Sequence, residues 1–556
     1  MKNANNYAKG YFMPPVPCYD WVKRDAVTKA PQWCSVDLRD GNQALIVPMS
    51  LDEKIEFFKI LVKTGFKEIE IGFPAASETE YAFTRALIEN GLIPDDVTVQ
   101  VLTQARGHII DKTFEALRGA KNAVVHLYNS VSVAQREQVF RKSKDEIKRI
   151  ATDGAKMLRA AAAKTPGSFM FEYSPESFTG TEPEFALDVC NGVIETLAPA
   201  ENEKVIINLP ATVELSMPHV YACQVEYMSK NLIRRERVTL SLHPHNDRGC
   251  AVADTELALL AGGERVEGTL FGNGERTGNA DILTIAMNMF THGVDPKLDL
   301  SNVPMLVEAY ERLTAMQVNP RAPYAGSLVF TAFSGSHQDA IAKGLRYRAE
   351  NNPRNWSVPY LPLDPSDLGR SYDGDVIRIN SQSGKGGIGY LMETKFGYNL
   401  PQKMREEFGY KVKDVSDRAR KELSPADVLA VFQKEYVDIT SPVAFLDYSS
   451  TKKDGKIHVE IRYNKDGKIR AAKGVGNGVL DAASDALTAS LSFTYDDLSY
   501  SEHALESGSN ARAAAYVGLK QKDAPAVWAA GVDSDIITAS IKAFVGAINK
   551  TLNATK

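Results

Sequence analysis

The chain has 556 residues, of which 44% are hydrophobic and 24% are charged, and its formal net charge is −5. This composition is ordinary for a globular protein and excludes wholesale disorder, and the length predicts several domains. The sequence has no basic stripe typical of nucleic-acid binders, no run of ~20 apolar residues able to span a bilayer, and no C-x-x-C pair among its five cysteines. The polar N-terminus lacks the apolar segment of a signal peptide, so we expect a cytoplasmic protein without nucleic-acid or membrane partners.

Eight short β-rich segments alternate with amphipathic helical stretches over the first three hundred residues. Such alternation predicts βαβ units with a parallel sheet, and eight units are the number in a (β/α)₈ TIM barrel of the α/β class. A doubly wound open sheet is the alternative, but the segment RDGNQ after the first strand lacks the dinucleotide fingerprint. The expected strands are 33–38, 67–73, 97–103, 122–128, 169–173, 204–209, 238–243 and 265–271.

Past residue 295 the pattern changes to a mixed, mainly helical linker. Helices are expected within 302–350 and 399–437, with a short strand at 376–380 between them. One helix has a readable start, because Ser424 suits an N-cap, Pro425 the first helical position and Asp427 the positive end of the helix dipole. We therefore predict two small linker subdomains.

The remaining sequence predicts an α+β domain built from a repeated βββα unit. Two Asp-Gly pairs between alternating strands in 452–474 are a strong hairpin signal, and a helix follows at 479–491. Further strands are expected around 491–500, at 511–518 and near Val527, before a helix at 536–552. The expected domains are residues 1–300, 301–440 and 441–556.

The ends of the predicted barrel strands carry the residues of a metal site. His243 and His245 are two positions apart, so their imidazoles leave the same face of a strand. Asp40 follows the first strand, which neighbours the eighth in a closed barrel, and its carboxylate can reach the same point. Asn279 could add a carbonyl oxygen. Two imidazoles and one carboxylate suit Mg²⁺, Mn²⁺ or Zn²⁺, whereas hydrogen bonding within the barrel mouth is the structural alternative.

Two further charged residues stand near this predicted metal. The Arg39 guanidinium precedes Asp40 and suits a bidentate oxo acid, neutralising the negative charge that develops during reaction. Its alternative role is a salt bridge to Asp40 or Glu70. Glu176 follows the fifth strand and could act in catalysis or remain a solvated loop carboxylate.

Three long motifs carry a resemblance to a known family. The segments VDLRDGNQ (36–43), SLHPHNDRG (241–249) and LFGNGERTGN (270–279) resemble the signature segments of 2-isopropylmalate synthases. The segments FEYSPESFTGTE, NLPATVE and TAFSGSHQDAI resemble the longer type of that family. The similarity extends over the whole chain. It implies an acyltransferase that condenses acetyl-CoA with 3-methyl-2-oxobutanoate and water to give 2-isopropylmalate and CoA, the first committed step of leucine biosynthesis. It also implies a divalent metal, Mg²⁺ in the first place, and activation by a monovalent cation.

The resemblance implies roles for individual residues of this chain. Asp40, His243 and His245 match the family's metal ligands, with Asn279 as a fourth, while Arg39 and Thr212 match residues that steady the oxo acid. His337 matches a residue of acid/base catalysis, and Glu176 and Tyr360 match accompanying active-site residues. The family's partner subunit contributes His337 and Tyr360, which implies a homodimer. The loop matching the acetyl-CoA pocket comprises Gly272, Asn273, Gly274 and Glu275.

The C-terminal module resembles the family's leucine-sensing domain. Glycine-bearing turns introduce both of its predicted helices and could bind a small anion or zwitterion at the helix N-termini. The resemblance implies feedback inhibition by L-leucine, and a dimer-stabilising module that senses nothing is the alternative. The candidate regulatory residues are Gly474, Gly476, Gly531 and Asp533.

Other functions remain open on the residues alone. Homocitrate and citramalate synthases share the expected metal site and differ in the pocket for the oxo-acid side chain, where a methylene contributes only about 1–3 kcal/mol. Hydroxymethylglutaryl-CoA lyases run a reverse cleavage but lack the long C-terminal module. From a different class, the chain could be a catalytically inactive leucine-binding sensor, although the intact predicted site argues against that.

Overall fold

The computed structural model describes residues 2–554 apart from 202, 333, 373–384, 420–422, 507, 509–510 and 523. The chain divides into two compact units. The first comprises Met1–Val329 with Pro365–Arg370, and the second comprises Phe330–Asp364 with Ser371–Lys556. Among the described residues, no helix has both the length and the apolar character needed to cross a bilayer.

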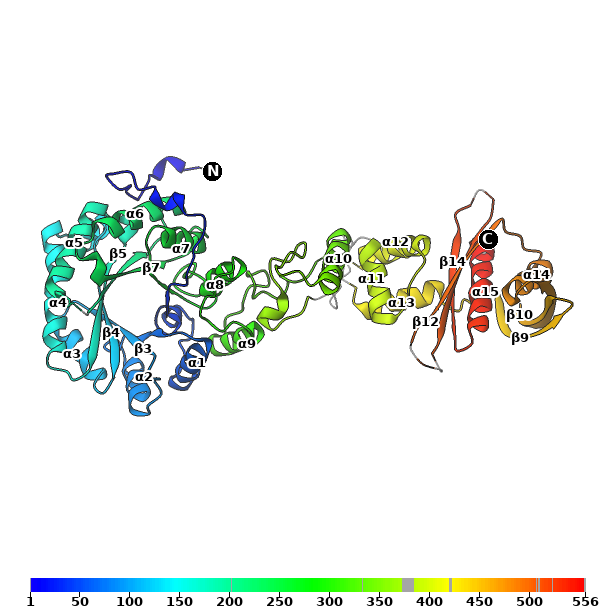
Figure 1. Cartoon of the computed structure of the whole chain (residues 1–556), viewed down its shortest axis with the longest axis horizontal. Helices are drawn as coiled ribbons and strands as arrows, with labels where there is room; N and C mark the ends of the chain where they lie inside the picture. Colours follow the sequence, from blue (N-terminus) through cyan, green and yellow to red (C-terminus); the bar gives the residue numbers. More distant parts are fainter. Residues whose placement is uncertain are drawn as a thin grey trace. The chain divides into compact units, whose positions relative to one another are not determined.

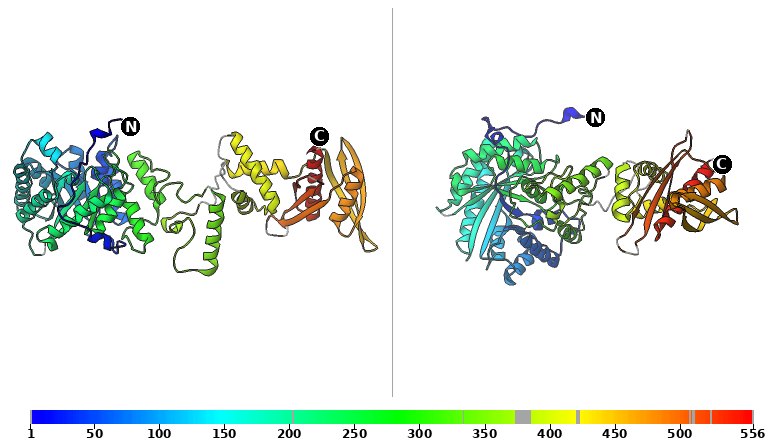
Figure 2. Two further views of the ribbon diagram at one scale, coloured as in Figure 1. Left: turned by 90° about the horizontal axis from the view of Figure 1, so that it is seen from above. Right: turned by 45° about the vertical axis from the view of Figure 1, so that its right-hand side comes forward.

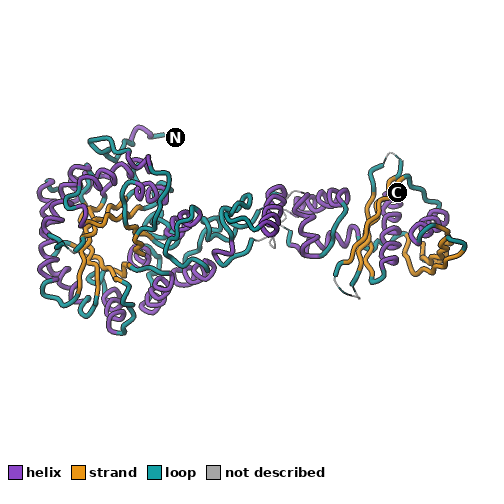
Figure 3. The backbone as a smooth tube through the Cα atoms, viewed as in Figure 1, coloured by secondary structure: helices purple, strands orange, loops and turns teal. Residues whose placement is uncertain are grey.

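The first unit contains a closed barrel of eight parallel strands in the order of the sequence. The first and last strands close it, with Gln32 of β1 paired to Arg265 of β8. Figure 3 shows the strands as an inner ring surrounded by helices. The predicted TIM barrel is therefore confirmed. The strands are β1 Gln32–Ser35, β2 Glu68–Gly72, β3 Thr98–Gln104, β4 Asn122–Ser130, β5 Ser168–Glu176, β6 Val205–Ala211, β7 Val238–Pro244 and β8 Arg265–Gly268.

The barrel helices begin where the sequence provides caps. Ser50 accepts a hydrogen bond from the Glu53 backbone N–H, and the Glu53 side chain accepts from the Ser50 N–H in return, so both residues fix the start of α1. Ser143 and Glu146 do the same for α4. The helices are α1 Leu51–Thr64, α2 Glu78–Glu89, α3 Gly107–Ala116, α4 Lys144–Ala162, α5 Pro183–Leu197, α6 Pro218–Asn231, α7 Ala251–Leu260, α8 Ile282–Thr291 and α9 Val303–Thr314, and Figure 1 places them around the strands.

Two predicted strands of the barrel are shorter than expected at the end that forms the site. The first strand stops at Ser35 rather than at residue 38, and a one-turn π-helix, η3 (Asp37–Gly41), follows at once. The eighth stops at Gly268, because the chain turns there and the backbone N–H of Thr269 donates to the carbonyl of Ala280. Both turns bring polar side chains over the mouth of the barrel.

The helices of the second unit are α10 Gly335–Asn351, α11 Lys385–Phe396, α12 Gln402–Ala419 and α13 Pro425–Tyr436. Three of them correspond to the predicted helical ranges 302–350 and 399–437, whereas α11 was not predicted as a helix. The predicted cap of α13 is confirmed, because the Ser424 side chain accepts from the Asp427 N–H and the Asp427 carboxylate accepts from the Ser424 N–H. The strand predicted at 376–380 lies outside the described residues.

The predicted βββα repeat is confirmed in the C-terminal part of this unit. Three antiparallel strands and a helix occur twice, and each Asp-Gly pair turns with positive φ, as two-residue hairpin loops require. The second repeat's first strand begins at Asp497 rather than near 491, because α14 continues through Leu491. Figure 2 shows α15 lying against its sheet. The elements are β9 Val443–Lys453, β10 Lys456–Lys465, β11 Lys468–Gly476, α14 Val479–Leu491, β12 Asp497–Ala504, β13 Ala513–Lys520, β14 Val527–Asp533 and α15 Ile536–Ala554.

Candidate metal centre and active site

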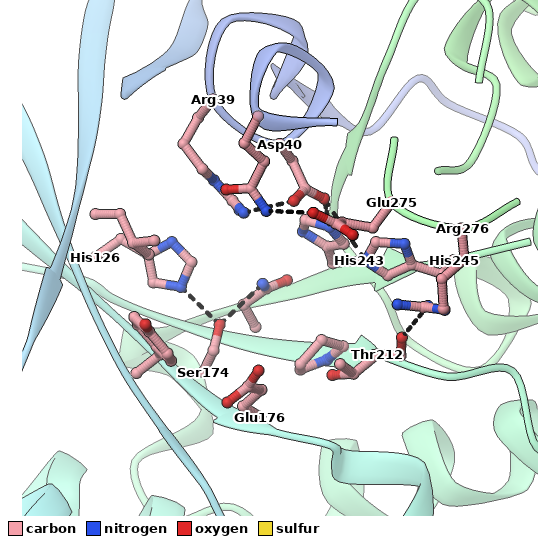
Figure 4. Close-up of a pocket in the computed structure, with 15 residues that line it drawn as sticks. Arg39, Asp40, His126, Ser174, Glu176, Thr212, His243, His245, Glu275 and Arg276 are labelled. Carbon is pink, nitrogen blue, oxygen red and sulfur yellow. Dashed lines mark hydrogen bonds and ion pairs between the residues drawn. The ribbon is translucent and has the colours of Figure 1, made fainter. Parts of the chain in front are cut away.

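A cavity of about 240 Å³ lies at the carboxyl ends of the barrel strands. In barrels of this type the loops that follow the strands build the active site, so the position identifies the candidate site. Figure 4 shows its side chains converging from several strands. The lining residues are Arg39, Asp40, Gln43, Leu102, His126, Tyr128, Ser174, Glu176, Asn208, Pro210, Thr212, His243, His245, Glu275 and Arg276.

Three of the four predicted metal ligands form a buried group whose ligand atoms all lie within 4.8 Å of one another. Asp40 Oδ2 is 3.2 Å from His243 Nε2 and 3.6 Å from His245 Nε2. The fourth, Asn279, places Oδ1 3.0 Å from His243 Nε2. Strand β7 presents His243, His245 directly follows that strand, and η3 presents Asp40, so one point receives candidate ligands from residues two hundred positions apart.

A tight glycine loop holds Asn279 and Asp40 in place. The Asn279 side-chain amide donates to the backbone carbonyl of Asn273 at 3.0 Å, and the Asn273 amide donates to the carbonyl of Gly41 at 3.0 Å. A Cβ at Gly274 would lie 2.2 Å from Asn279 Nδ2. Gly272 has a φ of 73°, in the left-handed region that favours glycine. These residues therefore shape the metal site, whereas their predicted contact with acetyl-CoA remains a prediction.

The ionisation of the group favours cation binding. Burial alone would raise the pKa of Asp40, but Arg39 and the two imidazoles hold that pKa well below its ordinary value, so the carboxylate stays charged. Burial lowers the pKa of His245 to about 4, which keeps its imidazole neutral at pH 7. Burial also opposes charge on His243, but hydrogen bonds to Asp40 and Glu267 outweigh it and raise its pKa to about 9. The oxygens that attract a proton to His243 Nε2 would equally attract a metal.

The residues present fit a divalent metal. The His245 nitrogen that faces Asp40 is Nε2, and at 3.6 Å from Asp40 Oδ2 it makes no hydrogen bond with that oxygen. Neutral imidazoles with a carboxylate and an amide oxygen are ligands that several divalent metals accept. Asp40, His243 and His245 thus form a buried set able to hold such an ion.

Arg39 makes both of the ion pairs that formed its alternative role. Its Nη1 is 2.8 Å from Asp40 Oδ1, and its Nε is 2.5 Å from Glu70 Oε2. Glu70 is fully buried, so this second pair fixes the plane of the guanidinium. Arg39 also lines the cavity. The ion pairs therefore orient the guanidinium toward the cavity rather than removing it from the site.

Thr212 and Glu176 line the opposite side of the cavity from Asp40, as Figure 4 shows. Thr212 Oγ1 accepts a hydrogen bond of 2.8 Å from the Ser177 backbone N–H, so the hydroxyl proton remains available to a ligand. Glu176 accepts from the Ser130 hydroxyl. Both side chains are therefore held by neighbouring residues, Ser177 and Ser130, and face the same space as the candidate metal ligands.

His337 and Tyr360 belong to the second unit, whereas the cavity is lined by residues of the first. His337 lies in the first turn of α10, and its ring stacks on that of Tyr360 with centroids 4.0 Å apart and an angle of 21° between the planes. The structure thus pairs these two predicted active-site residues with each other.

Sequence reasoning assigned no role to several polar residues that line the cavity, among them His126, Ser174, Asn208 and Arg276. His126 Nε2 forms a hydrogen bond of 2.7 Å with the Ser174 hydroxyl, and the Asn208 amide donates to the same hydroxyl at 3.0 Å. Arg276 pairs with Asp247 and donates to the Thr212 carbonyl at 2.5 Å. A signal existed for His126, since it is a lone ionisable residue in the apolar run NAVVHLY of a buried strand.

The candidate regulatory glycines are close-packing positions. A Cβ at Gly474 would lie 2.3 Å from the Ala482 carbonyl oxygen of α14, and one at Gly531 would lie 2.1 Å from the Ala539 carbonyl oxygen of α15. Gly476 has a similar clash with α14. Asp533 accepts from the Asp535 N–H and from Lys542 Nζ. Helix packing therefore accounts for the glycines, and a leucine-binding role stays a prediction.

Family models match three successive parts of the chain. Residues 30–309 match HMGL-like. Residues 327–393 match the alpha-isopropylmalate synthase, post-catalytic domain-like model, and 422–552 match the LeuA allosteric (dimerisation) domain. The class of protein follows from the closed barrel, the candidate ligand group and these family matches. The chain is a barrel enzyme with a candidate divalent metal site and an appended allosteric domain.

Relatives of known name cover almost the whole chain. A 2-isopropylmalate synthase of Desulfitobacterium hafniense is 60% identical over 549 residues, covering 99% of this chain and 98% of the relative. One from Helicobacter hepaticus is 60% identical over 98% of this chain and 99% of the relative, and one from Acetoanaerobium sticklandii is 52% identical over 98% and 96%. The chain belongs to the 2-isopropylmalate synthase family.

Proposed function

We propose that this chain condenses acetyl-CoA with 3-methyl-2-oxobutanoate and water to give 2-isopropylmalate and CoA. One observation carries the proposal: Asp40, His243 and His245 converge on one point at the mouth of a closed barrel. The chain's near-complete alignment with 2-isopropylmalate synthases supports the same reaction. The expected catalytic, linker and regulatory parts are 1–300, 301–440 and 441–556.

The metal, Mg²⁺ in the first place, would be held by Asp40, His243 and His245, with Asn279 as a fourth ligand. Bound there, a divalent ion polarises the keto group of the oxo acid as a Lewis acid. Arg39 would pair with the substrate carboxylate and stabilise the alkoxide that forms. It is suited to this because Glu70 already fixes its orientation. Glu275 and the loop Gly272–Gly274 would lie beside acetyl-CoA.

The cavity also contains groups suited to the organic substrate. The Thr212 hydroxyl can donate to the oxo-acid carboxylate, since its oxygen already accepts from Ser177. Glu176 stands at the same face as an accompanying active-site carboxylate. His337 is the candidate base that removes a proton from the acetyl methyl group, and the stacked ring of Tyr360 would keep its imidazole in place.

A homodimer would complete the site, with the partner subunit's copies of His337 and Tyr360 serving this barrel. The match to the LeuA allosteric (dimerisation) domain supports association of two chains. An obligate dimer would also explain why the stacked pair and the cavity belong to different units of one chain.

Substrate specificity is tested by release of CoA from acetyl-CoA with a panel of 2-oxo acids. We expect the highest kcat/KM with 3-methyl-2-oxobutanoate. 2-Oxoglutarate and pyruvate, the substrates of homocitrate and citramalate synthases, should be poorer by at least tenfold. Pyruvate lacks two carbons of the isopropyl group, each contributing about 1–3 kcal/mol in an apolar pocket, and 2-oxoglutarate would bring a charged carboxylate into that pocket. A clear preference for either rival substrate would replace the proposed reaction, and no CoA release with any oxo acid would favour an inactive sensor.

Feedback inhibition by L-leucine is the regulatory part of the proposal. We expect activity to fall as L-leucine is titrated into the assay, with L-alanine as the matched control. The match of residues 422–552 to an allosteric domain supports this expectation. Activity that stays flat to millimolar leucine would leave the C-terminal part as a dimer-stabilising module.

A further inference from the structure

Beneath the candidate metal centre, a buried carboxylate contacts one of the proposed ligands from behind. Glu267, on strand β8, is fully buried, and its Oε2 lies 2.6 Å from His243 Nδ1. The opposite ring nitrogen, Nε2, faces Asp40 Oδ2 and Asn279 Oδ1. His243 is thus clamped between a carboxylate on one side and the candidate metal position on the other.

This contact decides which nitrogen of His243 can bind a metal. A neutral imidazole carries one proton, and a strong acceptor at Nδ1 draws that proton to Nδ1. The lone pair then resides on Nε2, toward the candidate centre. In metal sites, partners of this kind fix the tautomer and the ring orientation, and their loss costs 10–100-fold in metal affinity.

We propose that Glu267 is a positioning residue that orients His243 Nε2 toward the divalent metal. The proposal rests on the metal site proposed above. Glu267 acts through His243, because its carboxylate neither lines the cavity nor belongs to the ligand group around Asp40. Glu267 also forms a second buried group with His126 and Glu172, so Glu172→Gln tests whether that group binds the ion instead.

The carboxylate of Glu267 is held from four directions. Oε2 also accepts from the Asn208 amide at 3.0 Å, while Oε1 accepts from Arg265 Nη1 at 2.8 Å and from Gln100 Nε2 at 2.9 Å. Arg265 in turn donates from Nη2 to the Gln100 carbonyl oxygen at 2.8 Å. These hydrogen bonds fix the orientation of the Glu267 carboxylate. Because that carboxylate contacts His243 Nδ1, it also fixes the position of the His243 ring.

A second acid in the same interior provides a matched control. Glu172, on β5, is also fully buried, but neither of its carboxylate oxygens has a hydrogen-bond partner among the described residues. Its nearest basic groups are Arg265 Nη1 and His126 Nε2, both at 3.3 Å. Burial raises the pKa of Glu172 well above its ordinary value, so a neutral amide is a close substitute for this side chain.

The test is Mn²⁺ binding to the full chain, titrated by electron paramagnetic resonance, with unfolding temperature as the folding control. We expect Glu267→Gln to weaken Mn²⁺ binding by about 10–100-fold and Glu172→Gln to change it by less than about twofold. Glu267→Asp keeps the negative charge but moves it away from the His243 ring, because the aspartate side chain is shorter. It should therefore also weaken Mn²⁺ binding. It serves as the second variant if the glutamine form does not fold.

Three outcomes separate the possible errors. Wild-type Mn²⁺ affinity in both Glu267 variants, with binding lost in His243→Ala, would overturn the positioning role and leave the metal site standing. Equal loss in Glu172→Gln and Glu267→Gln would also overturn it, since general disturbance of the interior would then explain both. No Mn²⁺ binding by the unaltered protein would instead refute the proposed metal site.

Discussion

Replacing His243 with alanine is expected to lower kcat by about 10³-fold or more and to abolish metal binding. A Lewis-acid metal contributes several kcal/mol to transition-state stabilisation, and each 1.36 kcal/mol is a factor of ten in rate. Alanine removes the ligand whose Nε2 faces both Asp40 and Asn279. The measurements are steady-state CoA release and metal content after dialysis against Mg²⁺. Chelation of the unaltered protein with EDTA should give a similar loss, reversed by Mg²⁺.

The matched control is His292→Ala, because His292 is an exposed histidine that follows α8 in the same unit. It should retain normal activity and normal metal content. If His243→Ala kept more than about a tenth of the activity, or if EDTA had no effect, metal catalysis at this cluster would be refuted.

His337→Ala is expected to lower kcat by at least about a hundredfold while the metal content stays unchanged. A positioned general base contributes typically 10²–10⁴-fold to rate, and His337 does not belong to the candidate ligand group Asp40, His243 and His245. The effect should therefore appear in rate rather than in binding of the ion. The measurements are kcat and metal content of the purified variant.

His458→Ala is the control for this variant, since His458 lies on β10 of the same unit, away from the stacked pair. Near-normal turnover of His337→Ala would remove His337 from the base role. Loss of metal together with loss of rate would point instead to a folding defect.

Much of the barrel was predictable because its signals are local. Each strand is a short apolar run, and each capped helix start, such as Ser50 with Glu53, needs only residues within one turn. The same is true of the Asp454–Gly455 turn, whose positive φ values are a property of the two residues themselves. Predictions that depended on strand ends were less accurate, because hydrogen bonds from distant loops decide where β1 and β8 stop.

The candidate site was only partly predictable. His243 and His245 share a face because alternation along a strand is a local rule. The position of Asp40 over them depends on η3, and the role of Glu267 depends on a contact made across the barrel interior. The segment RVEGTLF (265–271) places the charged Glu267 in a buried strand, but the segment does not reveal that His243 is its partner.

By itself, the sequence determined the eight-strand barrel, the βββα repeat and the family, and it selected the candidate metal ligands. Only the tertiary structure decided that Asp40 Oδ2 lies 3.2 Å from His243 Nε2, that Glu70 orients Arg39 and that Glu267 holds the ring from behind. It also decided that Gly474 and Gly531 serve helix packing. The reason is physical: periodicity and capping arise between neighbours in the chain, whereas distances between side chains arise from closure of the barrel and from packing of helices on sheets.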